Sequence, residues 1–149
     1  MEGIIFVGIQ ASGKSTFYHD RFSNTHLRIN LDMLKTRHRE KRLIETCLEI
    51  SQRFVIDNTN PTVTDRERYI ILLKNQGWKI IGYYFKSSIT DSIERNQKRQ
   101  PSQQVPIKGI RGTYSRLIVP KYEEGFDQLY YVEAQPGRKF IVSQWIDEV

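Results

Sequence analysis

The stretch Gly8-Ile9-Gln10-Ala11-Ser12-Gly13-Lys14-Ser15 matches the pattern G-x-x-x-x-G-K-[ST] at every defined position. The apolar run before it, residues 3–8, is typical of a strand that is buried on both faces. A helix is expected to follow over about residues 15–22. Glycines let the loop backbone curl inward, and the helix adds its positive dipole end. This strand, loop and helix therefore predict a binding site for phosphate oxygens.

The side chains of this loop are expected to bind a nucleoside triphosphate. Lys14 would reach the β- and γ-phosphates, and the Ser15 hydroxyl would bind Mg²⁺, which prefers oxygen ligands. Thr16 belongs to the predicted set, although its side chain is expected to pack or to cap the helix. The predicted nucleotide-binding residues are Gly8, Gln10, Ala11, Ser12, Gly13, Lys14, Ser15, Thr16, Arg95 and Arg99. ATP and Mg²⁺ are the implied ligands. A GTPase is set aside, because neither Asp-x-x-Gly nor Asn-Lys-x-Asp occurs in the sequence.

Strand-like and helical patterns alternate along the rest of the chain. Strands are expected at 27–30, 54–57, 79–85, 128–133 and 140–145. Helices are expected over 32–52, from a capping box at 64–67 to Gly77, over 90–99 and over 107–119, with an irregular loop at 100–104. This alternation predicts an α/β fold of the P-loop NTPase type, a mostly parallel sheet with helices on both faces. We expect one domain over residues 1–149, with a lid region at about 95–108.

Composition and charge narrow the class of protein. With 149 residues and 38% hydrophobic residues, the chain can bury one core, and its one cysteine cannot form an internal disulfide or a zinc site alone. There is no long apolar run and no signal-peptide pattern at the N-terminus, which predicts a soluble cytoplasmic protein without membrane contact. Residues 1–119 hold 20 basic and 11 acidic residues, an excess that suits a polyanionic partner or, alternatively, a solvated surface.

Two acidic residues follow predicted strands, where ligands of a parallel sheet bind. Asp32 follows the strand at 27–30 and is the candidate general base for an acceptor hydroxyl, with helix N-capping as the alternative role. Asp57 ends the strand at 54–56, where a magnesium-associated acid is found. The alternative for Asp57 is a local turn with Asn58 and Asn60.

Basic residues are expected beside both the ATP and the acceptor. Arg95 and Arg99 are one helical turn apart and would close over the transferring phosphoryl group, with Arg99 closer, unless they only form a solvated face. A second basic run after Asp32, at 35–42, favours a large anionic acceptor. Aromatic residues in the strands are assigned to packing, and the three histidines to surface or capping positions.

Together these stretches resemble the kinase domain of the polynucleotide 5′-hydroxyl kinase family, seen in phage polynucleotide kinase and mammalian polynucleotide kinase/phosphatase. The matching segments, in order, are Gly8 to Thr16, Ile29-Asn30-x-Asp32, Ile56 to Pro61, Arg66-x-Arg68-Tyr69, Arg95-Asn96-x-x-Arg99, and Val105-Pro106 followed by Tyr114. Pro120 and Glu124-Gly125-Phe126 fit the mammalian form. This ordered set is much narrower than the phosphate loop alone.

The resemblance implies transfer of the ATP γ-phosphate to the 5′-hydroxyl end of DNA or RNA, as in end healing. It implies three catalytic residues, Asp32 as general base, Lys14, and Arg99 as the lid arginine. The implied acceptor contacts are Lys35 or Arg39, together with Asp57 and Asn58, and the implied metal-site residues are Ser15 and Asp57. A P-loop kinase acting on a small molecule, and a nucleotide-binding module without turnover, remain the alternatives. The oligomeric state is left open.

Overall fold

The computed structural model describes residues 1–86 and 88–146, in which strands and helices alternate. The strands are β1 (Glu2–Val7), β2 (Leu27–Ile29), β3 (Phe54–Ile56), β4 (Lys79–Phe85), β5 (Gln128–Gln135) and β6 (Lys139–Gln144). The α-helices are α1 (Lys14–Arg21), α2 (Leu31–Leu34), α3 (Arg37–Ile50), α4 (Val63–Asn75), α5 (Ile89–Gln97) and α6 (Ile107–Arg116). Two short 3-10 helices, η1 (Pro101–Gln103) and η2 (Tyr122–Glu124), complete the described elements.

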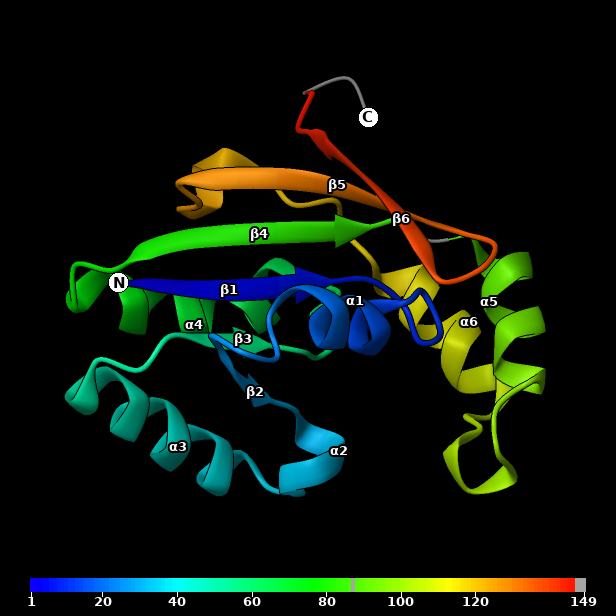
Figure 1. Ribbon diagram of the computed structural model, residues 1–149, viewed down its shortest axis with the longest axis horizontal. Coiled ribbons are helices and arrows are strands. Elements are labelled where there is room, and N and C mark those ends of the chain that lie inside the picture. Colours follow the sequence, from blue (N-terminus) through cyan, green and yellow to red (C-terminus); the bar gives the residue numbers. More distant parts are fainter. Residues whose placement is uncertain (87, 147–149) are drawn as a thin grey trace.

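The strands form one mixed sheet in the order β2-β3-β1-β4-β5-β6. The first five strands in this order, which include β1, pair in parallel with their neighbours. The last strand, β6, is antiparallel to β5. The predicted mostly parallel α/β sheet is therefore confirmed. In Figure 1, β1 and β4 point toward the end of the molecule at which α5 and α6 lie. This end carries the loops that follow the parallel strands, where ligands of such sheets bind.

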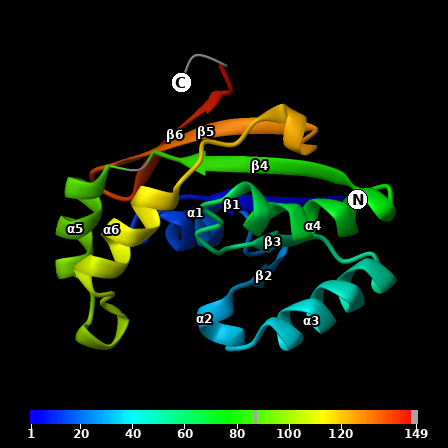
Figure 2. The ribbon, with the colours of Figure 1, turned by 180° about the vertical axis from the view of Figure 1, so that it is seen from behind.

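Apolar clusters cover both faces of the sheet. On one face, Ile44 of α3 and Leu73 of α4 pack with Ile5 and Ile56 of the sheet. On the other face, Phe17 of α1 packs against a group of aromatic rings that includes Phe6 and Phe85. Seen from behind in Figure 2, α4 lies in front of the sheet and α1 on its far side. Of the aromatic residues assigned to packing, Tyr84 and Phe85 of β4 and Trp78 just before it are buried. The others are partly buried and pack against the two core clusters, and they are Tyr83, Tyr130, Tyr131 and Trp145.

Several element boundaries differ from the sequence prediction because local capping decides them. The helix expected over residues 32–52 is divided into α2 and α3 at Lys35, which has a φ of 74°. Thr36 starts α3 by accepting a hydrogen bond from the Arg39 amide. The capping box of α4 lies at Thr62 and Asp65, two residues earlier than expected. The loop expected to be irregular at 100–104 contains η1, and α6 ends at Arg116 rather than near residue 119.

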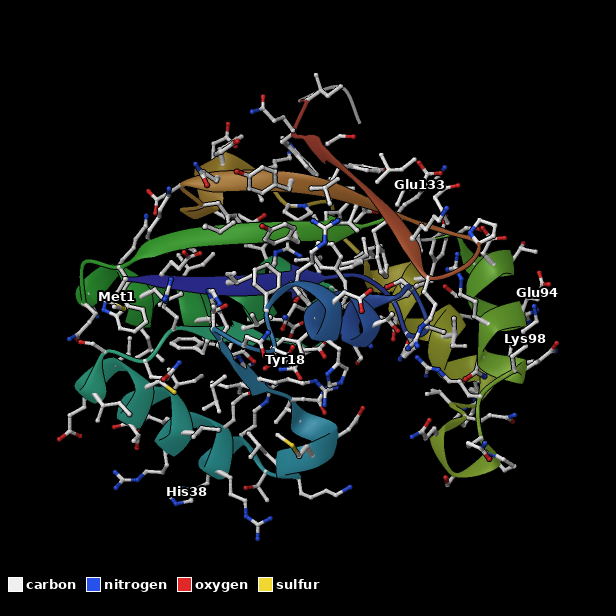
Figure 3. The ribbon with its side chains drawn as sticks, viewed as in Figure 1. Met1, Tyr18, His38, Glu94, Lys98 and Glu133 are labelled. Carbon is white, nitrogen blue, oxygen red and sulfur yellow. The ribbon has the colours of Figure 1, made fainter. Side chains whose placement is uncertain are left out.

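The histidine assignment is wrong for His26. Its ring is buried, its Nδ1 is 2.7 Å from Thr25 Oγ1, and its Nε2 is 3.7 Å from a Glu2 carboxylate oxygen. Burial lowers the pKa of this imidazole, while Glu2 acts to raise it. By contrast, His38 is exposed and projects from the outer side of α3 (Figure 3).

Within the described residues, the helices are too short and too polar for any of them to cross a lipid bilayer.

Candidate active site

A cavity of about 330 Å³ lies at the carboxyl ends of β1, β2 and β3. Four separate segments line it, and their lining residues are Gln10, Ala11, Lys14 and Ser15 after β1, Asn30, Leu31 and Asp32 after β2, Asp57, Asn58 and Thr59 after β3, and Arg99, Gln103 and Val105 from the predicted lid. The parallel topology thus brings together residues that are far apart in the sequence. The three residues implied to be catalytic all line this one cavity, and they are Lys14, Asp32 and Arg99.

The predicted phosphate loop has the curled backbone that its glycines suggested. Ala11 and Gly13 have positive φ angles of 59° and 100°. Position 8 has no room for a side chain. A Cβ atom there would lie 2.9 Å from Phe85 Cβ and 2.9 Å from Ser12 Oγ. The Gly8 amide donates a hydrogen bond to the Thr59 carbonyl at 3.0 Å, which ties this loop to the segment after β3.

Lys14 is folded onto the backbone of its own loop. Its Nζ donates hydrogen bonds to the carbonyl oxygens of Gly8 and Ile9, at 2.9 and 2.7 Å. Burial lowers the pKa of this lysine to about 8, opposed by the nearby carboxylate of Asp57, and Arg99 lowers it further. Lys14 is therefore a buried cation held by neutral carbonyl groups at the wall of the cavity.

Ser15 and Asp57 meet across the base of the cavity. Ser15 Oγ donates a hydrogen bond to Asp57 Oδ2 at 3.1 Å, and Asp57 is only 2% exposed. Asp57 therefore interacts across the fold rather than only in a turn with Asn58 and Asn60. A hydroxyl and a carboxylate are hard oxygen donors that suit Mg²⁺. No set of three His, Cys, Asp or Glu side chains that could hold a metal occurs in the described part of the chain. Mg²⁺ would therefore need phosphate or water oxygens as its other ligands.

Arg28 also belongs to this part of the site, and the sequence prediction missed it. Its Nε donates to Asp57 Oδ2 at 2.8 Å, and its Nη2 donates to Ser15 Oγ at 2.9 Å. The available signal was a charged residue inside a predicted strand, because its acidic partner Asp57 comes 29 residues later in the chain. Only the pairing of β2 with β3 makes that signal specific.

Asn30, rather than Asp32, caps helix α2. The Asn30 side chain accepts a hydrogen bond from the Met33 amide at 3.0 Å and donates one to the Asp57 carbonyl at 2.6 Å. The alternative capping role for Asp32 is therefore wrong. Asp32 lies in the first turn of α2 and lines the cavity, where its negative charge acts to raise the pKa of Arg99 and of Lys14.

A buried polar network supports the first turn of α2, which carries Asp32. Asn58 Oδ1 accepts a hydrogen bond from the Leu31 amide, and Asn58 Nδ2 donates to Glu40 Oε2 at 3.1 Å. Glu40 is 3% exposed and also accepts from Arg37 and from the Tyr69 hydroxyl. Burial and the charge of Glu40 raise the pKa of Tyr69 to about 12. The sequence prediction missed Glu40, although its position four residues before buried Ile44 places it on the inner face of α3.

The two predicted lid arginines both face the phosphate loop. Arg95 Nη1 donates to the Ala11 carbonyl at 3.4 Å. Arg99 lies beyond the end of α5 rather than on it, and it lines the cavity. Burial lowers the pKa of Arg99, although Asp32 acts in the opposite direction. Glu94 of α5 and Lys98 at the end of this helix form an ion pair, and Figure 3 shows both residues at the edge of the molecule.

Asn96 holds the ends of the loop after α5 together. Its Nδ2 donates to the Val105 carbonyl at 2.7 Å, and its Oδ1 accepts from the Val105 amide at 2.9 Å. A further contact joins α6 to the phosphate loop, because Gln10 Nε2 donates to Thr113 Oγ1 at 3.0 Å. The predicted lid segment is therefore hydrogen-bonded within itself, and helix α6 is hydrogen-bonded to the phosphate loop.

The implied acceptor residues divide into two groups. Asp57 and Asn58 line the cavity, whereas Lys35 and Arg39 do not. Both basic residues are exposed at the junction of α2 and α3, and Arg39 Nη1 donates to the Leu34 carbonyl at 3.2 Å. The structure therefore does not bring Lys35 or Arg39 to the site that holds Asp32.

The sheet order and the loop after β1 match the fold of solved P-loop kinases. A gluconokinase from Sinorhizobium meliloti matches with a TM-score of 0.58 and 16% identity, over 91% of this chain and 84% of that chain. The APS kinase of Mycobacterium tuberculosis, solved in complex with AMPPNP and APS, matches with a TM-score of 0.54 and 12% identity, over 93% and 90% of the two chains. At these identities the likeness concerns the fold alone.

Two curated proteins resemble this chain in sequence. The bifunctional polynucleotide phosphatase/kinase of Schizosaccharomyces pombe is 31% identical over 134 residues, which are 84% of this chain and 32% of the relative. A relative from Acanthamoeba polyphaga mimivirus bears the name "Putative bifunctional polynucleotide phosphatase/kinase". It is 30% identical over 135 residues, which are 86% of this chain and 32% of the relative. No family model matches the chain. The chain spans about a third of the length of these relatives. The family resemblance drawn from the sequence is confirmed: the chain is similar to the polynucleotide phosphatase/kinases and has the fold of P-loop kinases.

Proposed function

We propose that this chain transfers the γ-phosphate of ATP to the 5′-hydroxyl end of DNA or RNA. The observation that carries the proposal is the presence of Lys14, Asp32 and Arg99 in one cavity. A phosphate-binding cation, an acid that can accept the hydroxyl proton and an arginine for the transferring group are the parts that phosphoryl transfer requires. The names of the two curated relatives support a polynucleotide as the acceptor.

In this proposal the curled loop and the start of α1 bind the triphosphate. Lys14 leaves the Gly8 and Ile9 carbonyls to donate to phosphate oxygens. The backbone amides at the start of α1 would bind the same anion. Ser15 and Asp57 would hold Mg²⁺, which when bound neutralises phosphate charge. Residues 95–108 act as a lid, in which Arg99 contacts the transferring phosphoryl group.

The acceptor hydroxyl binds between Asp32 and the phosphate loop. The Asp32 carboxylate accepts its proton as the oxygen attacks the γ-phosphorus, and ADP leaves on the opposite side. The Asn58 and Glu40 network keeps the first turn of α2 in place during this step. Exposed basic residues such as Lys35 and Arg39 would contact phosphates of the same strand farther from its end.

The buried free thiol of Cys47 suits a reducing compartment such as the cytoplasm.

The direct test follows the labelled phosphate. The purified protein is incubated with γ-labelled ATP, Mg²⁺ and 5′-hydroxyl DNA or RNA oligonucleotides, with 5′-phosphorylated oligonucleotides and Asp32→Ala as controls. Label on 5′-hydroxyl ends alone, lost in Asp32→Ala, is the expected result. Slow ATP hydrolysis without labelled nucleic acid would instead favour a small-molecule acceptor. Absence of ATP binding would overturn the nucleotide site itself.

A further inference from the structure

The two oxygen atoms proposed to hold Mg²⁺ are already in contact with a cation of the protein. Arg28 Nε is 2.8 Å from Asp57 Oδ2, and Arg28 Nη2 is 2.9 Å from Ser15 Oγ. These two acceptors are themselves hydrogen-bonded at 3.1 Å. The guanidinium group therefore spans both members of the Ser15 and Asp57 pair in a two-pronged contact.

Asp57 needs such a counter-charge. The Asp57 side chain is only 1% exposed, and a buried carboxylate without a partner is strongly destabilising. Lys14 does not pair with it, because its Nζ bonds to the Gly8 and Ile9 carbonyls. Among the described residues, Arg28 forms the ion pair with Asp57.

The position of Arg28 allows it to withdraw. It projects from β2, at the edge of the sheet, and its side chain is 25% exposed. A divalent cation arriving at Asp57 would replace the lost positive charge, while the guanidinium reaches solvent. Mg²⁺ and Arg28 both need the lone pairs of Asp57 Oδ2 and Ser15 Oγ, because Mg²⁺ requires short oxygen contacts at fixed angles.

We propose that Arg28 is a built-in competitor of the divalent cation, which binds to Ser15 and Asp57 only as the guanidinium withdraws. This inference rests on the proposed function, since it assumes the metal site of that proposal. Arg28 then sets the metal affinity of the site. It keeps the free protein a weak metal binder and leaves the site to a cation that arrives with a nucleotide. It acts on the metal through Ser15 and Asp57, so it is a positioning residue rather than a catalytic one.

The test measures metal binding rather than turnover. Mn²⁺ is titrated into the protein, with and without ADP, and free Mn²⁺ is followed by electron paramagnetic resonance. Arg28→Gln is expected to lower the Kd for Mn²⁺ about tenfold, the size of effect set by a hydrogen-bonded charge at a partly exposed site. Lys79→Gln, which removes one positive charge at the opposite ends of the strands, should leave the Kd unchanged.

A second variant guards against loss of folding. Arg28→Lys keeps the charge but loses the fork that contacts both oxygens, so its Kd for Mn²⁺ should lie between those of wild type and Arg28→Gln. Thermal unfolding of each variant identifies a misfolded protein. Equal or weaker Mn²⁺ binding by folded Arg28→Gln and Arg28→Lys, with ADP binding intact, would overturn the role of Arg28 alone. If neither ADP nor Mn²⁺ binds to the wild type or to any variant, the proposed function is wrong, and the role of Arg28 is wrong as well.

Discussion

Lys14 Nζ lies 2.7 Å from the carbonyl oxygen of Ile9, inside the loop that is proposed to bind phosphate. Burial in this position lowers the pKa of Lys14 to about 8. The same lysine must be charged to attract a triphosphate. Nucleotide capture by the free protein and the stability of its fold are therefore both tied to one titration.

The first prediction concerns the pH dependence of nucleotide capture. Below pH 8 Lys14 is protonated, and above it the free protein loses the charge that binds ATP. The kcat/KM for ATP should therefore fall as pH rises through about 8, because this ratio reports ionisations of the free enzyme. At saturating ATP the bound phosphates favour the charged lysine, so kcat should hold to higher pH. Profiles of both parameters from pH 7 to pH 10 test this, and a flat kcat/KM would contradict it.

The second prediction concerns stability, and its sign follows from counting protons. Between about pH 8 and pH 10.5 the unfolded chain holds more protons on Lys14 than the native protein does, so stability from this group rises with pH. Relative to Lys14→Met, the wild-type free energy of unfolding should rise by up to about 3 kcal/mol over that window. Urea unfolding of both proteins at pH 7, 9 and 10 measures the difference. A difference that does not change with pH would show that Lys14 is not desolvated.

The third prediction separates chemistry from folding at Asp32. Because Asn30 caps α2, Asp32→Asn should leave the helix and the melting temperature nearly unchanged. Its kcat should fall by about 10²- to 10⁴-fold, the usual contribution of a general base. The affinity for ADP, measured by calorimetry, should stay close to that of wild type. A wild-type rate in this variant would remove Asp32 from the role of base.

The fourth prediction concerns Asn96, which joins the two ends of the loop that bears Arg99. Asn96→Ala removes both hydrogen bonds to Val105 and should lower kcat about tenfold, since misplacement of a catalytic arginine is costly. The KM for the acceptor should change less than kcat. Exposed Gln97 is the matched control, because Gln97→Ala leaves that loop closed. Unchanged kcat in a folded Asn96→Ala would show that the loop needs no such support.

The sequence predicted those parts of the site that depend on local pattern. The phosphate loop is read from residues that are adjacent in the chain, and Asp32 and Asp57 are found because each follows a strand. Contacts across the fold were less accessible. Arg28 reaches Asp57 over 29 residues, and Asn58 reaches Glu40 over 18, so both depend on the sheet order and on the packing of α3.

Competing local choices explain the remaining differences. Asn30 and Asp32 are both good helix caps, and only the hydrogen bond to Met33 decides for Asn30. Thr62 and Thr64 each precede an acidic residue by three positions, and the chain uses Thr62. The family resemblance implied that Lys35 contacts the acceptor, but its positive φ of 74° ends α2 and directs the chain into α3.

The last prediction concerns Arg66, which is fully buried beneath the loop that holds Asp57. Its Nε and Nη2 donate to the two carboxylate oxygens of Glu124 at 2.8 and 2.9 Å, and its Nη1 donates to the Asn60 carbonyl at 3.0 Å. Removing one partner leaves the other charge buried and unpaired. Glu124→Leu and Arg66→Met should each therefore lower the free energy of unfolding by about 3–5 kcal/mol.

The double variant Arg66→Met with Glu124→Leu is expected to lose much less than the sum of the two single changes, because no buried charge remains. Urea unfolding of all four proteins closes this cycle. The double variant should still lose activity, since the Asn60 carbonyl no longer receives the Arg66 hydrogen bond and the segment from Asp57 to Asn60 loosens. Additive losses of stability would mean that the two charges do not depend on each other, and wild-type turnover in the double variant would separate Arg66 from the site.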